Sequence, residues 1–334
     1  MFWQDRLQGK QSNITFLIFL ILLFTSSVGY LGFGKLPRAP AQKNNPFVTY
    51  NHLPVFFEHH GKIKKLQKSS VSETEDIKGY FEFHTSKLNP LPKYSRLVAP
   101  IFIWRLPGDL KRMEKVNHRK KIFIKLLLPL LIRHNIAITQ KRSFLKILMG
   151  KPILSLSIDE QNWLVKTALH YKVFDKSIPK PILTKEMLEE LLNRIDIIPV
   201  SLALAQSSLE TGWGTSRFSI HGNALFGQWT WKTNQGIRPK QRAPGKKYSV
   251  LRFSQLAESI ENYTHNLNSS SHYRSFRSKR NALRKAGYPT DLWAQNLVEK
   301  LKKYSSNYEH YIPTVKAIIR ENQLTEFDNY SLSP

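Results

Sequence analysis

Apolar residues recur at intervals of three and four along several stretches of this chain, a pattern typical of amphipathic helices. Ser157 and Glu160 have the spacing of a capping box, so we expect a helix that begins after Ser157 and runs to about Val173. Thr184 is placed to cap the next helix, whose apolar positions are Met187, Leu188, Leu191 and Leu192. These elements predict a mainly helical fold.

The stretch from Ile197 to Trp231 contains the helix around which the rest of the chain is organised. Pro199 suits a first helical turn, and Gly212 and Gly214 end the helix soon after Glu210. The residues expected to face the core are Leu202, Ala205 and Leu209. Glu210 instead shares a face with the small and polar residues Ala203, Gln206 and Ser207, which leaves room beside the carboxylate.

A long basic segment precedes that helix. From Leu110 to Leu148 the pattern predicts an amphipathic pair of helices with a solvated basic face. A face directed toward a membrane surface or a glycan is the alternative interpretation of the same charges.

The segments after the central helix are less regular. Residues 228–252 alternate poorly and carry several Gly and Pro residues, which favours a β-hairpin or flap. Ser254 is expected to cap a helix that runs through Tyr263 to Leu267. Further elements are a basic loop at 272–287 and two final helices, around 293–304 and 312–322.

An apolar run near the N-terminus, Ile14 to Phe24, lies within a charge-free stretch that extends to Gly34. Its core fits a signal peptide, while the whole stretch of about twenty uncharged residues fits a membrane helix. Proline inside Ala39-Pro40-Ala41 makes a poor cleavage site, so we expect an uncleaved anchor in the bacterial inner membrane. The rest of the chain would then lie in the periplasm, with release after signal cleavage as the alternative.

Composition narrows the function. The chain of 334 residues has no cysteine, which excludes disulfides, thiolate metal sites and a cysteine nucleophile. A net charge of +27 requires an anionic partner, and the predicted anchor favours cell-wall carboxylates and anionic lipid over nucleic acid. His59, His60 and His84 have no further ligand at metal-binding spacing, and no cofactor fingerprint is present, so neither metal nor cofactor is expected.

Glu210 is the residue that points most directly to chemistry. It lies at the exit of a mostly apolar helix and is followed by Gly-Trp-Gly, a place where burial can raise the pKa of a carboxyl group. A solvated glutamate at a helix end is the alternative that its spacing leaves open.

Two motifs in order, ALAQSSLETGWG and GNALFGQW, resemble the glucosaminidase domain of bacterial cell-wall hydrolases, glycoside hydrolase family 73. Within that family the chain is most similar to the Bax-type proteins of Gram-negative bacteria. The resemblance continues through RFSQLAESIENYTHNL and upstream through IFIKLLLPLLIRHN, and covers roughly Val98 to Leu324. It implies a lysozyme-like domain, mainly α with a small β-hairpin lobe.

The resemblance also implies roles for residues. Glu210 matches the general acid, and Tyr263 matches an aromatic position that orients it or stabilises developing charge. The residues implied to bind substrate are Gln206, Asn223, Phe226, Gly227, Gln228 and Trp229, with Trp231 as an alternative stacking partner. Phe226 is, with Trp213, also expected to be a core residue, and Gly222 and Gly227 are expected to allow close approach or positive φ.

A second carboxylate is harder to find. Glycosidases usually pair an acid with a second carboxylate, yet no Asp or Glu occurs from Thr211 to Ala257. Remote candidates are Glu258, Glu261 and Asp291. We favour substrate assistance, in which the N-acetyl oxygen of the sugar is the nucleophile.

The sequence therefore predicts a membrane-anchored endo-β-N-acetylglucosaminidase that cuts peptidoglycan on the reducing side of N-acetylglucosamine. The alternatives are a muramidase or lytic transglycosylase, and a scaffold that binds peptidoglycan without cutting it. The expected organisation is a cytoplasmic tail and anchor at 1–35, a linker and low-pattern region at 36–98, a basic helical region at 99–180, the glucosaminidase domain at 181–326 and a tail at 327–334.

Overall fold

A computed structural model describes residues 96–174, 182–242 and 244–333 of the chain. The predicted anchor, the linker and the three N-terminal histidines lie outside these residues. The helices are η3 (Gly108–Arg112), α4 (Val116–Met149), η4 (Ile153–Ser155), α5 (Ile158–His170), α6 (Lys185–Arg194), α7 (Val200–Thr211), α8 (Arg217–Gly222), η5 (Thr233–Gln235), α9 (Leu256–Ser269), η6 (Ser271–Tyr273), α10 (Arg274–Lys285), η7 (Thr290–Leu292), α11 (Trp293–Val298), α12 (Tyr308–Glu321) and η8 (Leu324–Asn329).

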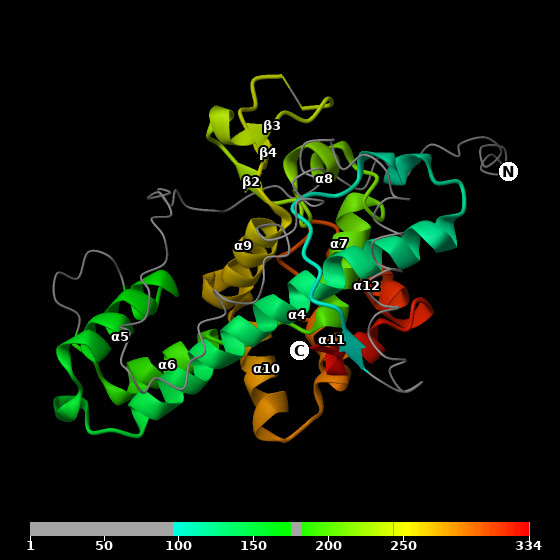
Figure 1. The fold of residues 1–334 in the computed structure, drawn as a ribbon. Coiled ribbons are helices and arrows are strands. Elements are labelled where there is room, and N and C mark those ends of the chain that lie inside the picture. The colour runs from blue at the N-terminus through cyan, green and yellow to red at the C-terminus, as the bar shows by residue number, and fades with distance from the viewer. Residues whose placement is uncertain (1–95, 175–181, 243, 334) are drawn as a thin grey trace, which may run out of the picture.

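Short strands complete the described part of the chain. β1 (Leu97–Val98) pairs in parallel with β5 (Ser331–Leu332), and β4 (Ser249–Leu251) lies between β2 (Trp229–Thr230) and β3 (Gly236–Ile237) in an antiparallel sheet. This small sheet projects from the helices in Figure 1. The prediction of a mainly α fold with a small β-lobe is confirmed.

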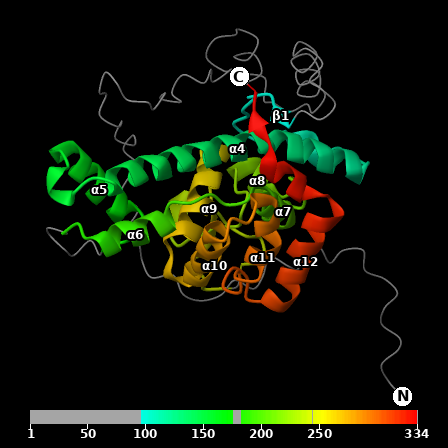
Figure 2. The same ribbon diagram turned by 90° about the horizontal axis from the view of Figure 1, so that it is seen from below.

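Helix α4 is the longest described helix, and other helices pack along it. Its 34 residues extend about 50 Å, with α5 and α6 beside one end and α7 and α12 beside the other (Figures 1 and 2). The predicted pair of helices is wrong, because the chain continues as one helix through Pro129. Proline removes one helical hydrogen bond, but buried leucines on both sides of it pack into the core and hold the helix together.

Within the described residues, α4 has the length and apolar composition that a membrane crossing would need. More than half of its most apolar stretch, 56%, is buried inside the protein. Its apolar residues therefore already have protein neighbours, and we treat α4 as a core helix.

The two ends of α4 belong to two hydrophobic clusters. The first cluster joins Phe123 and Leu127 to α7 and to the helices that follow it. The second joins Leu145 and Leu148 to Leu164 of α5, together with buried residues of α6. The first cluster includes the buried residues of α7, so α4 packs directly against the helix that ends at Glu210.

The predicted caps of α5 and α6 are confirmed. The Ser157 hydroxyl accepts from the Glu160 amide, and the Glu160 carboxylate accepts from the Ser157 amide. The Thr184 hydroxyl accepts from the Met187 amide. Helix α5 ends at His170, before the predicted Val173.

Two predictions near α9 and α10 are wrong. The N-cap of α9 is Gln255, and the Ser254 hydroxyl donates to the Glu258 carboxylate in place of accepting from a backbone amide of the helix. Residues predicted as a basic loop form helix α10, whose buried face includes Arg277 and Arg280. Because two of the buried positions of α10 are arginines, the apolar residues alone do not reveal the period of this helix.

Asp196, just before α7, is the centre of a buried ion cluster. Arg284 donates to both of its carboxylate oxygens, and guanidinium nitrogens of Arg142 and Arg280 lie 3.8 and 3.9 Å from Oδ2. Burial alone would raise the pKa of Asp196, but the three guanidiniums hold it below its ordinary value. The cluster ties α4 and α10 to the chain that enters α7.

Helix α7 is buried on nearly every side, with ten of its twelve residues buried. Leu202 and Ala205 face the core as predicted, and Leu209 is partly buried against it. The face of Ala203, Gln206 and Ser207, expected to leave room, is buried as well. Glu210 itself remains partly exposed at the end of this face.

The C-terminal residues 327–334, expected to be a tail, contribute to this packing. Asp328 of η8 accepts hydrogen bonds from the Ser201 amide, at 2.8 Å, and from the Ser201 hydroxyl. Ser201 lies in the first turn of α7, so Asp328 satisfies donors that the helix cannot pair internally.

Replacing Asp328 with alanine should therefore lower the free energy of unfolding by about 1–2 kcal/mol, the usual cost of losing a helix cap. Urea unfolding followed by circular dichroism measures the change. Glu326→Ala is the matched control, because Glu326 is an exposed acidic residue on the same short helix. Equal stability of the two variants would show that the contact does not hold α7 in place.

Candidate active site

Glu210 projects from the last turn of α7. The helix ends there because Gly212, Trp213 and Gly214 all have positive φ, at 57°, 59° and 83°. A Cβ on Gly214 would lie 2.9 Å from a ring carbon of Phe123 in α4, so only glycine fits. The predicted helix end is confirmed, and α4 fixes where the carboxylate emerges.

A relay of hydrogen bonds leads to that carboxylate. The Tyr263 hydroxyl donates to Gln206 Oε1 at 2.6 Å, and Gln206 Nε2 donates to the Tyr311 hydroxyl at 2.8 Å. Tyr311 in turn hydrogen-bonds the Glu210 carboxylate. Each donor faces the next acceptor, so the relay orients the Tyr311 hydroxyl toward Glu210.

The surroundings of Glu210 disfavour its charged form. Burial raises its pKa to about 7, and the hydrogen bond from Tyr311 opposes part of this shift. No charged side chain among the described residues contributes to the pKa of Glu210. The carboxyl therefore holds or releases a proton near neutral pH, as a general acid must.

Four buried tyrosines enclose this end of α7: Tyr263, Tyr273, Tyr304 and Tyr311. Burial raises the pKa of each tyrosine, and the nearby Glu210 raises it further for Tyr273, Tyr304 and Tyr311. Their hydroxyls thus stay protonated and act as donors. Only Tyr263 is predicted from the sequence, because the other three tyrosines fall outside the motifs that carry the family resemblance.

The GNALFG motif closes over the carboxylate. A Cβ on Gly227, whose φ is 63°, would lie 3.0 Å from Glu210 Oε2, so glycine is required at this contact. Phe226 is buried, its ring stacks on Tyr263 at 3.8 Å, and its carbonyl accepts from the Tyr304 hydroxyl. The expected close approach at Gly227 is confirmed, and Phe226 is a core residue.

Of the remaining predicted residues, Gln228 and Trp229 follow directly on the loop beside Glu210. Gln228 Nε2 donates to the Ser259 carbonyl, while its Oε1 is buried without a hydrogen-bond partner. Trp229 packs against Tyr248 at 4.2 Å, and Trp231 is 59% exposed. Gln228 thus offers an acceptor, and Trp231 an aromatic face.

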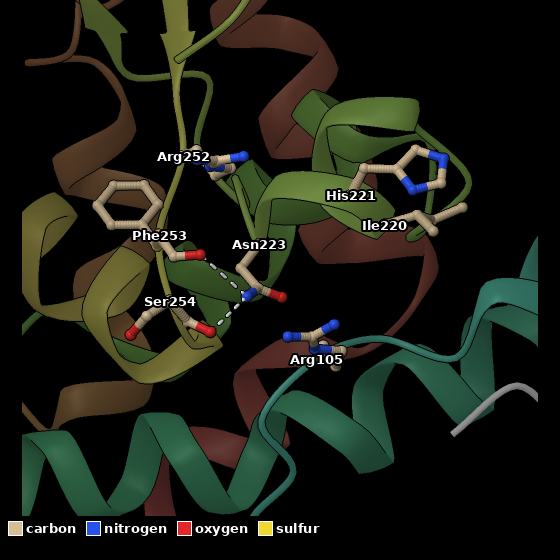
Figure 3. A pocket seen from close by; sticks show the side chains of 7 residues that line it. All are labelled: Arg105, Ile220, His221, Asn223, Arg252, Phe253 and Ser254. Carbon is tan, nitrogen blue, oxygen red and sulfur yellow. Dashed lines mark hydrogen bonds between the residues drawn. The ribbon is translucent and has the colours of Figure 1, made fainter. Parts of the chain in front are cut away.

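Three predicted residues turn away from any open space beside Glu210. Gln206 and Tyr263 are fully buried and satisfy each other within the relay. Asn223 lies at the end of α8, where its Nδ2 donates to the Phe253 and Ser254 carbonyls (Figure 3). The motif residues therefore divide between a buried scaffold and two separate surfaces.

The candidate second carboxylates are engaged elsewhere. Glu258 accepts from Ser254 at the start of α9, and Glu261 interacts with Lys141 of α4. Asp291 accepts from Asn329 beside η8. In the described parts of the chain, no group of His, Asp or Glu side chains is arranged to hold a metal ion.

Comparison with known proteins gives two matches. The family model described as a mannosyl-glycoprotein endo-β-N-acetylglucosaminidase, or glucosaminidase, matches residues 185–324. The chain is 34% identical over 217 residues to Protein bax of Escherichia coli (strain K12), which covers 64% of this chain and 74% of that protein. No solved structure matches significantly.

The matched family region begins with α6 and ends where η8 begins. It includes Glu210, all four tyrosines and the GNALFG motif. Helix α4 and the Asp328 cap lie outside it.

The raised pKa predicts how stability depends on pH. An ordinary glutamate in the unfolded chain ionises near 4.5, whereas folded Glu210 ionises near 7, so folding takes up a proton between these values. Wild-type stability from this group is thus present below pH 4.5 and lost as pH rises through 7. The free energy of unfolding of Glu210→Gln should therefore rise by about 2–3 kcal/mol relative to that of wild type as the pH goes from 4 to 8.

Urea unfolding at the two pH values measures this difference, and a gap that does not change with pH contradicts it.

Tyr311→Phe provides a second measurement. It removes the hydrogen bond that opposes the shift, so NMR titration should find the Glu210 pKa higher than in wild type.

Proposed function

Because the chain belongs to the Bax-type bacterial proteins that carry a glucosaminidase domain, we propose that it cleaves peptidoglycan with Glu210 as general acid. The family domain makes the protein a glycoside hydrolase. The proposed bond is the β-1,4 linkage on the reducing side of N-acetylglucosamine. The observation that carries this proposal is the partly exposed carboxyl of Glu210 at the end of α7, whose pKa desolvation raises to about 7.

The tyrosine relay gives that acid its orientation. Tyr311 holds one carboxylate oxygen, so the other can present its proton to the glycosidic oxygen of the leaving sugar. Gln206 and Tyr263 act through Tyr311 as positioning residues. Gln228 Oε1, which has no partner among the described residues, is suited to accept a hydrogen bond from a sugar hydroxyl or acetamide, and Trp229 or Trp231 to stack on a pyranose ring.

We further propose substrate assistance. Glu210 protonates the glycosidic oxygen of the leaving sugar. At the same time the acetamide oxygen of the N-acetylglucosamine bonds to the anomeric carbon of that N-acetylglucosamine, and the glycosidic bond breaks. Water then opens this ring intermediate, and Glu210 takes the proton back. The engagement of Glu258, Glu261 and Asp291 elsewhere supports a mechanism that needs one protein carboxylate.

The same single glutamate favours a second candidate, a lytic transglycosylase, in which a hydroxyl of the muramyl sugar attacks in place of water. Mass spectrometry of digested peptidoglycan separates the two, because a transglycosylase leaves an anhydro-muramyl end. A reducing N-acetylglucosamine end identifies the glucosaminidase.

The proposed location is the periplasmic side of the inner membrane. The charge-free N-terminal stretch supports an anchor, and the net charge of +27 suits the carboxylates of peptidoglycan and anionic lipid. In this proposal the anchor is the N-terminal stretch, while α4 remains in the folded domain.

Amide substitutions test the mechanism. Glu210→Gln keeps the shape of the side chain but has no proton to give, so wall cleavage should fall by roughly 10²–10⁴-fold. Glu258→Gln, Glu261→Gln and Asp291→Asn should each retain most activity. Peptidoglycan without its N-acetyl groups should resist even the wild-type enzyme.

A comparable loss from one of those three controls would replace substrate assistance with a two-carboxylate mechanism. Near-full activity of Glu210→Gln would refute both. Turbidity of purified sacculi and chromatography of the released fragments provide the measurements.

The location is tested separately. A reporter fused after Lys43 should be active only when it is one that works in the periplasm, because the preceding apolar stretch places this point beyond the membrane. Activity of a strictly cytoplasmic reporter at the same position would rule out the proposed orientation.

A further inference from the structure

A pocket of about 600 Å³ adjoins the GNALFG motif at Asn223. It is formed where the loop before η3, the end of α8 and the end of β4 meet (Figure 3). The lining residues are Arg105, Ile220, His221, Asn223, Arg252, Phe253 and Ser254.

Two arginines give the pocket its charge. Arg105 and Arg252 are exposed, and neither guanidinium makes an ion pair or hydrogen bond with another described residue. The lining contributed by the described residues includes no acidic side chain. Two unpaired guanidiniums from separate segments of chain are suited to bind an anionic group, because each offers a fork of donors.

Asn223 contributes a hydrogen-bond acceptor to the pocket, whereas the arginines contribute donors. Its side chain is 5% exposed, and Nδ2 donates to the Phe253 and Ser254 carbonyls at 3.1 and 3.0 Å. These two carbonyls fix the orientation of the amide, because an oxygen in place of Nδ2 would face two acceptors. Oδ1 therefore points away from them, is buried and has no partner (Figure 3).

A ligand that satisfies the pocket must combine an anion with a hydrogen-bond donor close to it. Inorganic phosphate and sulfate present mainly acceptors, so they leave Asn223 Oδ1 unpaired. An acylated amino acid has both groups, since its amide N–H and its α-carboxylate are attached to one carbon. Ile220 and Phe253 add apolar surface to the lining of the pocket.

We propose that this pocket binds the terminal α-carboxylate and adjacent amide of a short peptide. Arg105 and Arg252 hold the carboxylate, and Asn223 Oδ1 accepts from the amide N–H. The identity of the peptide rests on the proposed function, under which it is the stem peptide attached to the glycan.

The chain itself limits the separation of this pocket from the active site. Asn223 and Gly227, which contacts Glu210, are four residues apart, so their Cα atoms are at most about 14 Å apart. A peptide of a few residues spans such a distance. A stem peptide carried by a sugar near the cleaved bond can thus reach the pocket, and it would select glycan that still carries its peptides.

Direct binding tests the pocket without reference to cleavage. Full-length protein is titrated with N-acetylated dialanine that has a free carboxylate, and binding is followed by calorimetry or NMR. Converting the carboxylate to an amide, or methylating the last amide nitrogen, should each weaken binding about tenfold. Equal binding of all three peptides, or tighter binding of inorganic phosphate, overturns the proposal.

Paired variants locate the binding. Arg105→Gln with Arg252→Gln should weaken the dipeptide about tenfold. Arg112→Gln with Arg320→Gln removes the same charge from exposed positions outside the pocket and should leave binding unchanged. Equal loss in both pairs would show that net charge, not the pocket, attracts the peptide. Unchanged thermal unfolding midpoints verify that both pairs fold.

Cleavage assays connect the pocket to the proposed function. Wild-type enzyme should have a KM about tenfold lower for glycan strands with stem peptides than for strands freed of them, and the pocket pair should lose this preference with kcat unchanged. A preference that survives in the pocket pair overturns the proposal. If wild type cuts neither substrate, the proposed function fails, while the dipeptide titration still decides the pocket.

Discussion

The burial of α7 is the constraint on which the rest of the structure depends. A helix enclosed on nearly all sides must compensate every charge at its ends. Asp196 before it is compensated by three guanidiniums, and its pKa falls. Glu210 at the other end has only the hydroxyl of Tyr311, and its pKa rises to about 7. One buried helix thus carries a permanent ion cluster at its start and an exchangeable proton at its end.

The neutral relay explains how that proton can be both held and given up. A lysine or arginine beside Glu210 would stabilise the carboxylate and make it a poor acid. Tyrosines kept protonated by burial instead orient the carboxyl group without adding charge. The same tyrosine rings pack on the face of α7 that its small residues leave open. They therefore both bury the helix and help to raise the pKa of Glu210.

Arginine has two distinct uses in this basic chain. Arg142, Arg277 and Arg280 are buried and bind carbonyls or Asp196, so much of their charge is structural. Arg105 and Arg252 are exposed and unpaired around a pocket. Counting charge from composition cannot separate these uses, so the sequence predicts a basic loop where helix α10 buries Arg277 and Arg280.

Local chemistry decided what the sequence determined by itself. The caps at Ser157 and Thr184, the helix stop at Gly212 and the position of Glu210 depend on residues within a few places of one another. The tertiary structure alone decided that α4 continues through its proline, that Tyr311 reaches Glu210, and that Asn223 lines a pocket with Arg105 and Arg252. Each of these depends on burial by segments far apart in sequence, and burial sets both the pKa of a carboxyl group and the need of a polar atom for a partner.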